Sequence, residues 1–382
     1  MDDLSFWLVI VTVIIFVGYS ILIEYYRKGW RRLEEYDLPE VFAPTAKVTV
    51  IIPARNEEIA IGQCLQSIVN QHYPAELIQV IVIDDHSTDR TAEIVRSFKN
   101  DSIQLISLQD HVQDPINSYK KKAIDIGIAH ATGDWIITTD ADCIAGKDWI
   151  GTIIAYQQQT GAVMITSPVK LQPRNTLLSI FQSLDFITLQ GITAASISRG
   201  FHTMGNGANL CYLREAFLEV GGFRDIDHIA SGDDMLLMYK IARQHPGKIK
   251  YLKSRNALVT TEAPDSWRGF WQQRIRWASK ADKYDDKKIF WVLLLVYIVN
   301  LMLLVLFVLS FFNLDLLLIV ILFIFSKILL EFPFVSAVAS FFGERRLMKY
   351  FPFLQPLHIL YTVVAGWLGK FGSYEWKGRT VQ

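Results

Sequence analysis

The chain has 382 residues, of which 51% are hydrophobic, and it carries equal numbers of basic and acidic side chains, 38 of each. The zero net charge gives no indication of a nucleic-acid partner, and the apolar content is high for a soluble protein. Cys64, Cys143 and Cys211 show no C-x-x-C or zinc-ligand spacing, and no histidines form H-E-x-x-H, so we interpret the cysteines as reduced packing residues.

The first element is an uncharged apolar run over residues 4–23, which at roughly 20 residues is long enough to cross a bilayer. A cleaved signal peptide, the alternative, requires a basic start and a small-residue cleavage site. Here Asp2 and Asp3 precede the run, and Glu24 and Tyr25 follow it. We therefore predict an N-terminal transmembrane anchor over residues 4–23.

From Lys47 onward, short β-branched runs alternate with helical patterns. One strand is expected directly after Lys47 and a second over residues 78–85, with helices over residues 59–70 and 90–99. Continuous apolar strands between helices are typical of a parallel sheet that is covered on both faces. The sequence therefore predicts an α/β domain.

Polar side chains gather where these two strands end. The first strand ends in Pro53, Ala54, Arg55, Asn56 and Glu57, and the second in Asp84, Asp85, His86, Ser87, Thr88 and Asp89. Because Ser, Thr and Asp are favoured helix N-caps, we expect Asp89 to cap the following helix. Capping does not account for Asp84 and Asp85.

A third strand is expected over residues 135–139, and Asp140 and Asp142 stand at its carboxyl end. In open α/β sheets this end of the strands forms the ligand crevice. Two carboxylates one residue apart can hold a hard divalent cation that bridges a diphosphate. A solvated turn is the alternative, because Asp-x-Asp also occurs by chance in loops.

Together, the segments VTVIIPARNEE, VIVIDDHSTDRT and GDWIITTDADC resemble the successive motifs of the family 2 glycosyltransferases. The resemblance covers residues 48–280 and implies a GT-A fold, which is a Rossmann-like, mostly parallel sheet that binds a nucleotide sugar. It also implies a divalent metal, Mg²⁺ or Mn²⁺, held by Asp140 and Asp142. The implied donor-binding residues in these segments are Pro53, Arg55, Asn56, Glu57, Asp84, Asp85 and Asp140.

The segment from Lys120 to Gly127 is similar to the family's Lys-x-x-Ala-Leu-Asn-x-Gly element, with Asp125 in place of the usual Asn. The resemblance implies that Lys120 binds the donor, and a point charge beside a diphosphate is physically sensible. A solvated basic face formed by Lys120, Lys121 and Lys122 is the alternative.

A further strand is predicted over residues 162–169, followed by an amphipathic helix over residues 175–198. This helix either lies at the bilayer interface, as the resemblance implies, or packs in the core. Residues 205–223 then resemble the family's acceptor-side segment. The implied acceptor-binding residues are Gly207, Ala208 and Asn209.

Asp233 and Asp234 precede an apolar run and would suit helix N-caps. Paired carboxylates in a cleft also suit general-base catalysis, because each disfavours ionisation of the other. The resemblance favours the second role. It implies that Asp234 is the catalytic base and that Asp233 is its partner.

Gln273, Arg276 and Trp277 form a Gln-x-x-Arg-Trp arrangement, similar to that of the membrane-embedded synthases of chitin-like, hyaluronan and cellulose polymers. Arg offers a planar fork to phosphate oxygens, and Trp a flat face on which a sugar ring can stack. We therefore expect Gln273 and Arg276 to bind the donor and Trp277 the acceptor. An exposed amphipathic helix is the alternative.

The C-terminal region, residues 289–369, contains two or three apolar segments that could cross the membrane. Lys327 and Glu331 interrupt the second segment at i,i+4 spacing, so mutual neutralisation is favoured over a functional role. The third, over residues 353–368, is weaker because it contains Pro356 and Gly366.

Basic residues flank the middle of the chain on both sides. Arg27, Lys28, Arg31 and Arg32 follow the first span, and Lys283, Lys287 and Lys288 precede the second. By the positive-inside rule, this distribution predicts a cytoplasmic domain over residues 47–288 and an N-terminus outside. Lys370, Lys377 and Arg379 argue mildly against export of the C-terminus.

We thus predict a multi-pass integral protein of the plasma or inner membrane. The resemblance implies metal-dependent, inverting transfer of a hexosyl or N-acetylhexosaminyl group, with a UDP-sugar as the expected donor. The expected acceptor is a polysaccharide, an oligosaccharide or a lipid. Expected partners also include the bilayer and further envelope-biosynthesis proteins, but no nucleic acid. A catalytically silent nucleotide-sugar-binding scaffold and a nucleotidyltransferase are the alternatives.

Overall fold

The computed structural model describes residues 3–112, 116–172, 174–201, 204–229, 232–279, 287–371, 374–376 and 379–381. Lys283 and Lys377, which contribute to the predicted topology, lie outside the described residues. The chain divides into two compact units. We name residues 33–172 and 196–262 the sheet unit, and residues 1–32, 173–195 and 263–382 the helical unit.

The sheet unit is built on a seven-stranded sheet of order β3-β2-β1-β4-β8-β6-β9. Its strands are β1 (Val48–Ala54), β2 (Ile78–Asp84), β3 (Ile103–Ser107), β4 (Trp135–Thr138), β6 (Met164–Thr166), β8 (Leu210–Leu213) and β9 (Ile249–Tyr251). Strand β8 pairs antiparallel with β4 and β6, whereas the other neighbouring strands pair parallel. The predicted α/β fold with a mostly parallel sheet is confirmed.

The register of the central strands aligns their carboxyl ends. In the ladder, Ala54 of β1 pairs with Asp84 of β2, and Ile51 of β1 pairs with Thr138 of β4. The interior residues of β1 and β2 are almost completely buried, because β-branched side chains cover both faces of a parallel sheet. The polar residues that follow each strand are therefore carried to the same edge.

Helices and a small second sheet complete the sheet unit. The helices are α2 (Ile61–Val69), α3 (Thr91–Ser97), α4 (Tyr119–His130), α5 (Trp149–Thr160), α7 (Arg214–Glu219) and α8 (Asp233–Gln244), with 3-10 turns η1 (Ala75–Leu77), η2 (Leu108–Asp110) and η3 (Gly207–Asn209). The second sheet has the order β5-β10-β7, with β5 (Ile144–Ala145), β7 (Val169–Leu171) and β10 (Val259–Thr261).

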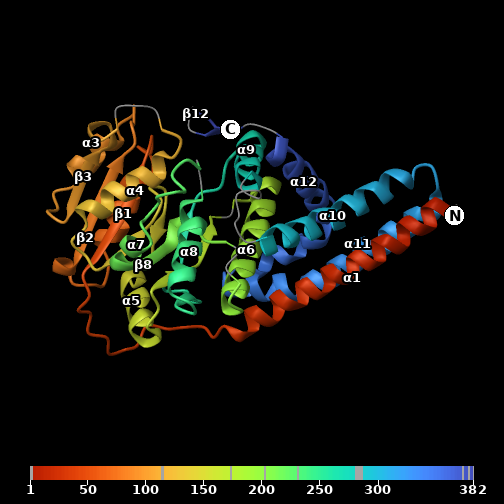
Figure 1. Ribbon diagram of the computed structural model, residues 1–382, viewed down its shortest axis with the longest axis horizontal. Helices are drawn as coiled ribbons and strands as arrows, with labels where there is room; N and C mark the ends of the chain where they lie inside the picture. Colours follow the sequence, from red (N-terminus) through yellow and green to blue (C-terminus); the bar gives the residue numbers. More distant parts are fainter. Residues whose placement is uncertain are drawn as a thin grey trace. The chain divides into compact units, whose positions relative to one another are not determined.

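Helix α4 packs closely on β1, as Figure 1 shows. The contact depends on Gly127, since a Cβ atom at this position would lie 2.8 Å from Cγ2 of Ile51. Such a distance is closer than packed carbon atoms tolerate. The glycine therefore sets how closely the C-terminal half of α4 approaches β1.

The helical unit contains the long apolar helices. It comprises α1 (Asp3–Arg32), most of α6 (Leu177–Ser198), α9 (Trp267–Ala278), α10 (Lys287–Leu309), α11 (Leu314–Phe341), η4 (Arg345–Lys349), α12 (Phe351–Phe371), β11 (Tyr374–Trp376) and β12 (Arg379–Val381). Helices α1, α10 and α11 lie side by side (Figure 1). Among the described residues, α1, α6, α10, α11 and α12 are long and apolar enough to cross a membrane, by length and composition.

Helix α6 differs from the other four helices because 72% of its apolar 18-residue stretch is buried. At Gly191 it packs against α11 so closely that a Cβ atom would lie 2.5 Å from Cγ2 of Val338. The sequence left open whether this helix lies at a bilayer interface or packs in the core. Its burial matches the core alternative.

A buried polar network joins α1, α11 and α12. Lys327 pairs with Glu331 at 2.7 Å and donates a hydrogen bond to Gln355 Oε1 at 2.7 Å. Gln355 Nε2 donates to the other oxygen of Glu331 at 2.9 Å, and the Tyr19 hydroxyl also donates to Glu331. The two charges neutralise each other, as their i,i+4 spacing predicts.

Candidate active site

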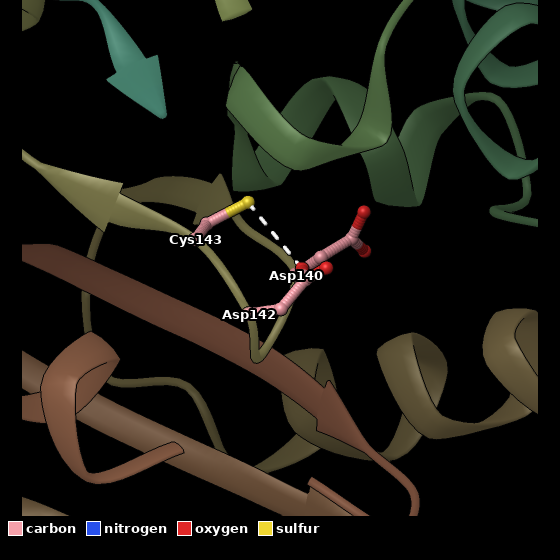
Figure 2. Close-up of side chains that lie close together, drawn as sticks. All are labelled: Asp140, Asp142 and Cys143. Atoms are coloured by element: carbon pink, nitrogen blue, oxygen red, sulfur yellow. Dashed lines mark hydrogen bonds between the residues drawn. The ribbon is translucent and has the colours of Figure 1, made fainter. Parts of the chain in front are cut away.

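Asp140 and Asp142 lie in the turn that follows β4, at the carboxyl edge of the sheet. Figure 2 shows the carboxylates beside the thiol of Cys143, and one ligand atom from each residue lies within 4.8 Å of the others. The Cys143 thiol donates to Asp142 Oδ1 at 3.8 Å, drawn as the dashed line in Figure 2. The other oxygen of Asp142 accepts a hydrogen bond from the Thr261 hydroxyl at 2.9 Å.

These three residues differ in the cations that they could bind. Burial and the neighbouring charges of Asp140 and Asp142 raise the pKa of the Cys143 thiol well above its ordinary value. Without a bound cation the thiol is therefore held in its protonated form, in which it is a poor ligand. Carboxylate oxygens remain, and they suit hard cations such as Mg²⁺ and Mn²⁺. The donor set thus fits the expected metal.

Lys120, in the first turn of α4, joins two groups of carboxylates. Its ammonium lies 2.6 Å from Asp140 Oδ1 and 3.5 Å from Asp233 Oδ2. Burial opposes the charge, but Asp140, Asp233 and Asp234 together raise the pKa of Lys120 above its ordinary value. Lys120 is therefore a charged member of the site and does not belong to a solvated basic face.

Lys121 is also turned inward. Its side chain is only 1% exposed, and its ammonium donates to the backbone oxygens of Ile226 and Ile229 at 2.6 and 2.7 Å. These residues belong to the segment that leads to Asp233. Of the three consecutive lysines only Lys122 is exposed, so the alternative of a basic surface face does not hold for Lys120 and Lys121.

Asp233 and Asp234 are the first two residues of α8, and Gly232 takes the N-cap position with φ at +81°. The N-cap alternative for the two aspartates is therefore wrong. Asp234 Oδ2 accepts a hydrogen bond from the backbone N–H of Gly207 at 3.2 Å, and Oδ1 accepts one from Met235 N at 2.7 Å. Both oxygens of Asp234 are thus oriented by backbone groups.

Three of the four predicted acceptor residues lie on η3, and of these three Gly207 borders the carboxylates. A Cβ atom at Gly207 would lie 2.9 Å from Asp233 Oδ2 and 3.3 Å from Lys120 Nζ, so a side chain here would push against both charged groups. Ala208 is buried. Asn209 is fully buried and bonded to the Trp149 indole, Pro168 O and Ala257 O. An acceptor contact by Asn209 stays a prediction.

The loops after β1 and β2, which were predicted to bind the donor, are joined by hydrogen bonds. Arg55 donates to the backbone oxygens of Asp85 at 2.8 Å and His86 at 3.2 Å. Asp85 is only 4% exposed, and its Oδ1 lies 4.0 Å from Arg55 and 3.0 Å from His86 Nδ1. Asn56 and His86 have positive φ values, +53° and +55°, which are uncommon outside glycine.

Further bonds hold these loops. Asn56 Oδ1 accepts from Thr88 N at 2.8 Å, and Asn56 N donates to Ser87 Oγ at 3.0 Å. Glu57 N donates to Thr91 Oγ1 at 2.7 Å, and Asp84 Oδ1 accepts from Ser87 N at 3.3 Å. Pro53 lies within β1 opposite Ile83 of β2. The predicted donor residues of these two loops thus form one continuous edge.

Asp89 was expected to be the N-cap of α3, but Arg90 occupies that position. Asp89 nevertheless accepts hydrogen bonds from Thr91 N and Glu58 N, both at 3.0 Å. Burial acts in the opposite direction, but a hydrogen bond from the Thr91 hydroxyl, together with these backbone hydrogen bonds, holds the pKa of Asp89 below its ordinary value. The residue stabilises the start of α3 from one position further upstream.

Gln273, Arg276 and Trp277 lie on α9, in the helical unit, whereas the residues described above belong to the sheet unit. The Gln273 Oε1 atom is buried and has no hydrogen-bond partner within the described part of the chain. The Trp277 ring lies 6.1 Å from that of Phe186, between centroids. Their contacts with donor and acceptor stay predictions.

Arg274 lies between the residues of the Gln-x-x-Arg-Trp arrangement and was not predicted as a site residue. The residue is 2% exposed, and its guanidinium pairs with Asp185 of α6 at 2.7 Å and lies 4.3 Å from the centroid of the Trp277 ring. The sequence does contain an indication of this ion pair, because Asp185 is the one charged residue in the sequence of α6 and needs a partner when buried. The sequence gives no comparable indication that the Thr261 hydroxyl donates a hydrogen bond to Asp142.

Family models and known proteins agree with this arrangement. The model described as "Glycosyl transferase family 2" matches residues 49–217, and "Glycosyl transferase family group 2" matches residues 135–368, which is more than half of the chain. A solved mannosyltransferase, PcManGT from Pyrobaculum calidifontis in complex with GDP-Man and Mn²⁺, has a TM-score of 0.57 and 19% identity, covering 94% of this chain and 98% of that one. The GT-A fold is thereby confirmed.

Two curated relatives match the same region. The protein named Probable glycosyltransferase YdaM, from Bacillus subtilis, is 30% identical over 61% of this chain and 54% of its own length. A poly-beta-1,6-N-acetyl-D-glucosamine synthase of Staphylococcus epidermidis is 25% identical over 60% of this chain and 53% of its own length. The chain thus spans about half the length of the curated relatives that it matches.

Proposed function

Because the chain belongs to the glycosyl transferase family group 2, we propose that it moves a hexosyl or N-acetylhexosaminyl group from a UDP-sugar to a glycan acceptor, with inversion at the anomeric carbon. One observation carries the proposal: Asp140 and Asp142 lie at the carboxyl edge of the sheet, and Lys120 connects Asp140 with Asp233. The poly-N-acetylglucosamine synthases among the relatives support an N-acetylhexosaminyl group and a glycan acceptor.

The donor end of the proposed site is the edge formed after β1, β2 and β4. Arg55, Asn56 and Asp85 would hold the base and ribose, because their hydrogen bonds already order both loops. Asp140 and Asp142 would hold Mg²⁺ or Mn²⁺, which supplies positive charge to a departing diphosphate. Lys120 adds a second positive charge from the protein itself.

At the acceptor end, Asp234 takes the proton from the acceptor hydroxyl while the oxygen of that hydroxyl bonds to the anomeric carbon. The bond from that carbon to the diphosphate breaks in the same step, and the electron pair leaves with the nucleoside diphosphate. Attack from the opposite face inverts the configuration. The Gly207 and Met235 N–H groups orient the Asp234 carboxylate for this role.

The proposed setting is a plasma or inner membrane, with the sheet unit in the cytoplasm, where nucleotide sugars are made. The apolar helices of the helical unit support membrane insertion. Lipid and oligosaccharide acceptors, and further envelope-biosynthesis proteins, belong to the same proposal. The family match does not favour the two alternatives, a silent scaffold and a nucleotidyltransferase, and neither needs a base at Asp234.

The test uses membranes that contain the full chain and a panel of nucleotide sugars, with release of nucleoside diphosphate as the readout. We expect release from one donor, dependent on Mg²⁺ or Mn²⁺ and abolished by EDTA. Asp142→Ala should abolish it, because one carboxylate cannot hold a solvated dication against water. Asp134→Ala, an exposed aspartate just before β4, is the matched control and should retain activity. Metal-dependent turnover in Asp142→Ala would overturn the proposal.

A further inference from the structure

Lys120 is shared between carboxylates that have different proposed tasks. Asp140 belongs to the donor end and Asp233 to the acceptor end, and the ammonium lies 2.6 Å from the first and 3.5 Å from the second. Gly207 closes the space beside this bridge, since a Cβ atom there would contact both Asp233 and Lys120. The lysine is thus confined between two anions.

Helix α4 is held in place near both of its ends. Near its C-terminal end Gly127 sets how closely the helix approaches β1, and in its first turn Lys121 ties the helix to the segment before α8 through Ile226 O and Ile229 O. The backbone of Lys120 is therefore fixed, and its ammonium can exchange one nearby anion only for another. Asp140 and Asp233 compete for the same ammonium, and a cation at Asp140 would compete with that ammonium for the carboxylate.

A divalent cation at Asp140 and Asp142 would stand next to this ammonium, and like charges at such short range repel each other strongly where water screens them poorly. We propose that Lys120 is a resident counter-cation that moves from Asp140 toward Asp233 and the donor diphosphate when the metal binds. Lys120 thereby couples occupation of the donor end to the charge at the acceptor end. This inference rests on the proposed function.

The coupling has a definite consequence. A metal ion by itself binds weakly, because it displaces Lys120 from Asp140 and brings no anion with which Lys120 can pair. A nucleoside diphosphate supplies that anion, so metal and nucleotide strengthen each other's binding by the same factor. The ammonium stays charged throughout, and only its partners change.

The experiment measures Mn²⁺ binding to the detergent-solubilised full chain by electron paramagnetic resonance, with and without UDP. Lys120→Gln should bind Mn²⁺ alone about 10-fold more tightly than the wild type does. The factor by which UDP strengthens Mn²⁺ binding should be about 10-fold smaller in this variant than in the wild type. Lys120→Arg keeps the charge and should resemble the wild type. Lys122→Gln, an exposed position on the same helix, is the matched control. Unchanged or weaker binding of Mn²⁺ alone by Lys120→Gln overturns the inference.

A double-mutant cycle tests the link to the acceptor end. Asp233→Asn removes the alternative partner of Lys120, so Mn²⁺ alone should bind several-fold more weakly. The same substitution should have a much smaller effect in the Lys120→Gln background, because no ammonium remains to be transferred. Equal effects in both backgrounds would show that Asp233 acts only through its charge and would overturn the link. Loss of Mn²⁺ binding in Asp142→Ala, with no effect of Lys120→Gln, would reject this inference but leave the proposed function intact.

Discussion

Asp233 and Asp234 are neighbours in sequence, but their carboxylates have different partners. Asp233 faces the ammonium of Lys120, whereas Asp234 is oriented by two backbone N–H groups. Asp234→Asn keeps the size of the side chain but cannot accept a proton. We expect donor affinity to survive and sugar transfer to fall by about 100-fold or more. Single-turnover transfer and UDP binding, measured on the same preparation, separate the two effects.

Asp233→Asn is the variant to compare with Asp234→Asn, because the carboxylate of Asp233 is paired with Lys120 in the wild type. We expect it to retain more transfer activity than Asp234→Asn. If Asp234→Asn transferred sugar at the rate of the wild type, Asp233 would become the first candidate for the base.

Asp89 predicts a pH dependence of stability. Its pKa is held below the ordinary value of 3.8, so its contribution is fully present above that value and is lost as the pH falls through the lower folded-state pKa. Asp89→Asn should lower the stability by about 1 kcal/mol at neutral pH, and this difference should shrink below about pH 4. Thermal unfolding in detergent from pH 3 to 7 measures it.

Asp101→Asn, an exposed aspartate of the same unit, serves as the control for this series and should show no such trend. A difference between the wild type and Asp89→Asn that stayed constant with pH would mean that the charge of Asp89 is unimportant.

At the scale of the elements, the network between Lys327 and Glu331 determines how α1, α11 and α12 fit together. Lys327 is completely buried, so Glu331→Gln would leave its charge without an ionic partner in the interior. We expect a loss of about 3 kcal/mol or more. Lys327→Met in addition should recover most of that loss, because no buried charge then remains. Denaturant unfolding in micelles measures both variants.

Lys349→Met removes an exposed lysine from η4 and should change the stability by no more than about 0.5 kcal/mol. If Glu331→Gln were equally mild, water or lipid would have to reach Lys327.

At the scale of the whole molecule, the distribution of basic residues predicts a cytoplasmic sheet unit. The three native cysteines are buried, so an introduced cysteine reports its own position. Asp101→Cys should react with a membrane-impermeant thiol reagent only after permeabilisation. Asp3→Cys, near the N-terminus, should react in intact cells. Labelling of Asp101→Cys in intact cells would reverse the orientation and separate the site from cytoplasmic nucleotide sugars.

The parallel part of the sheet was predictable because it is encoded locally. The strands β1, β2 and β4 are continuous apolar runs, and parallel strands must end at one edge. Asp84, Asp85, Asp140 and Asp142 therefore could be assigned to that edge before their contacts were known. Strand β8 was missed, since its four residues lie within a segment that was interpreted only as acceptor-binding.

The pairings inside the site could not be predicted, because they join residues that are distant in the chain. The sequence alone determined that Lys120 and Lys121 are charged, and local patterns allowed both to lie on a solvated face. Only the tertiary structure decided that Lys120 bridges Asp140 and Asp233 while Lys121 is buried against backbone oxygens. The physical reason is that a charge can be buried only where folding supplies its partners, and no local pattern records which distant partners will be supplied.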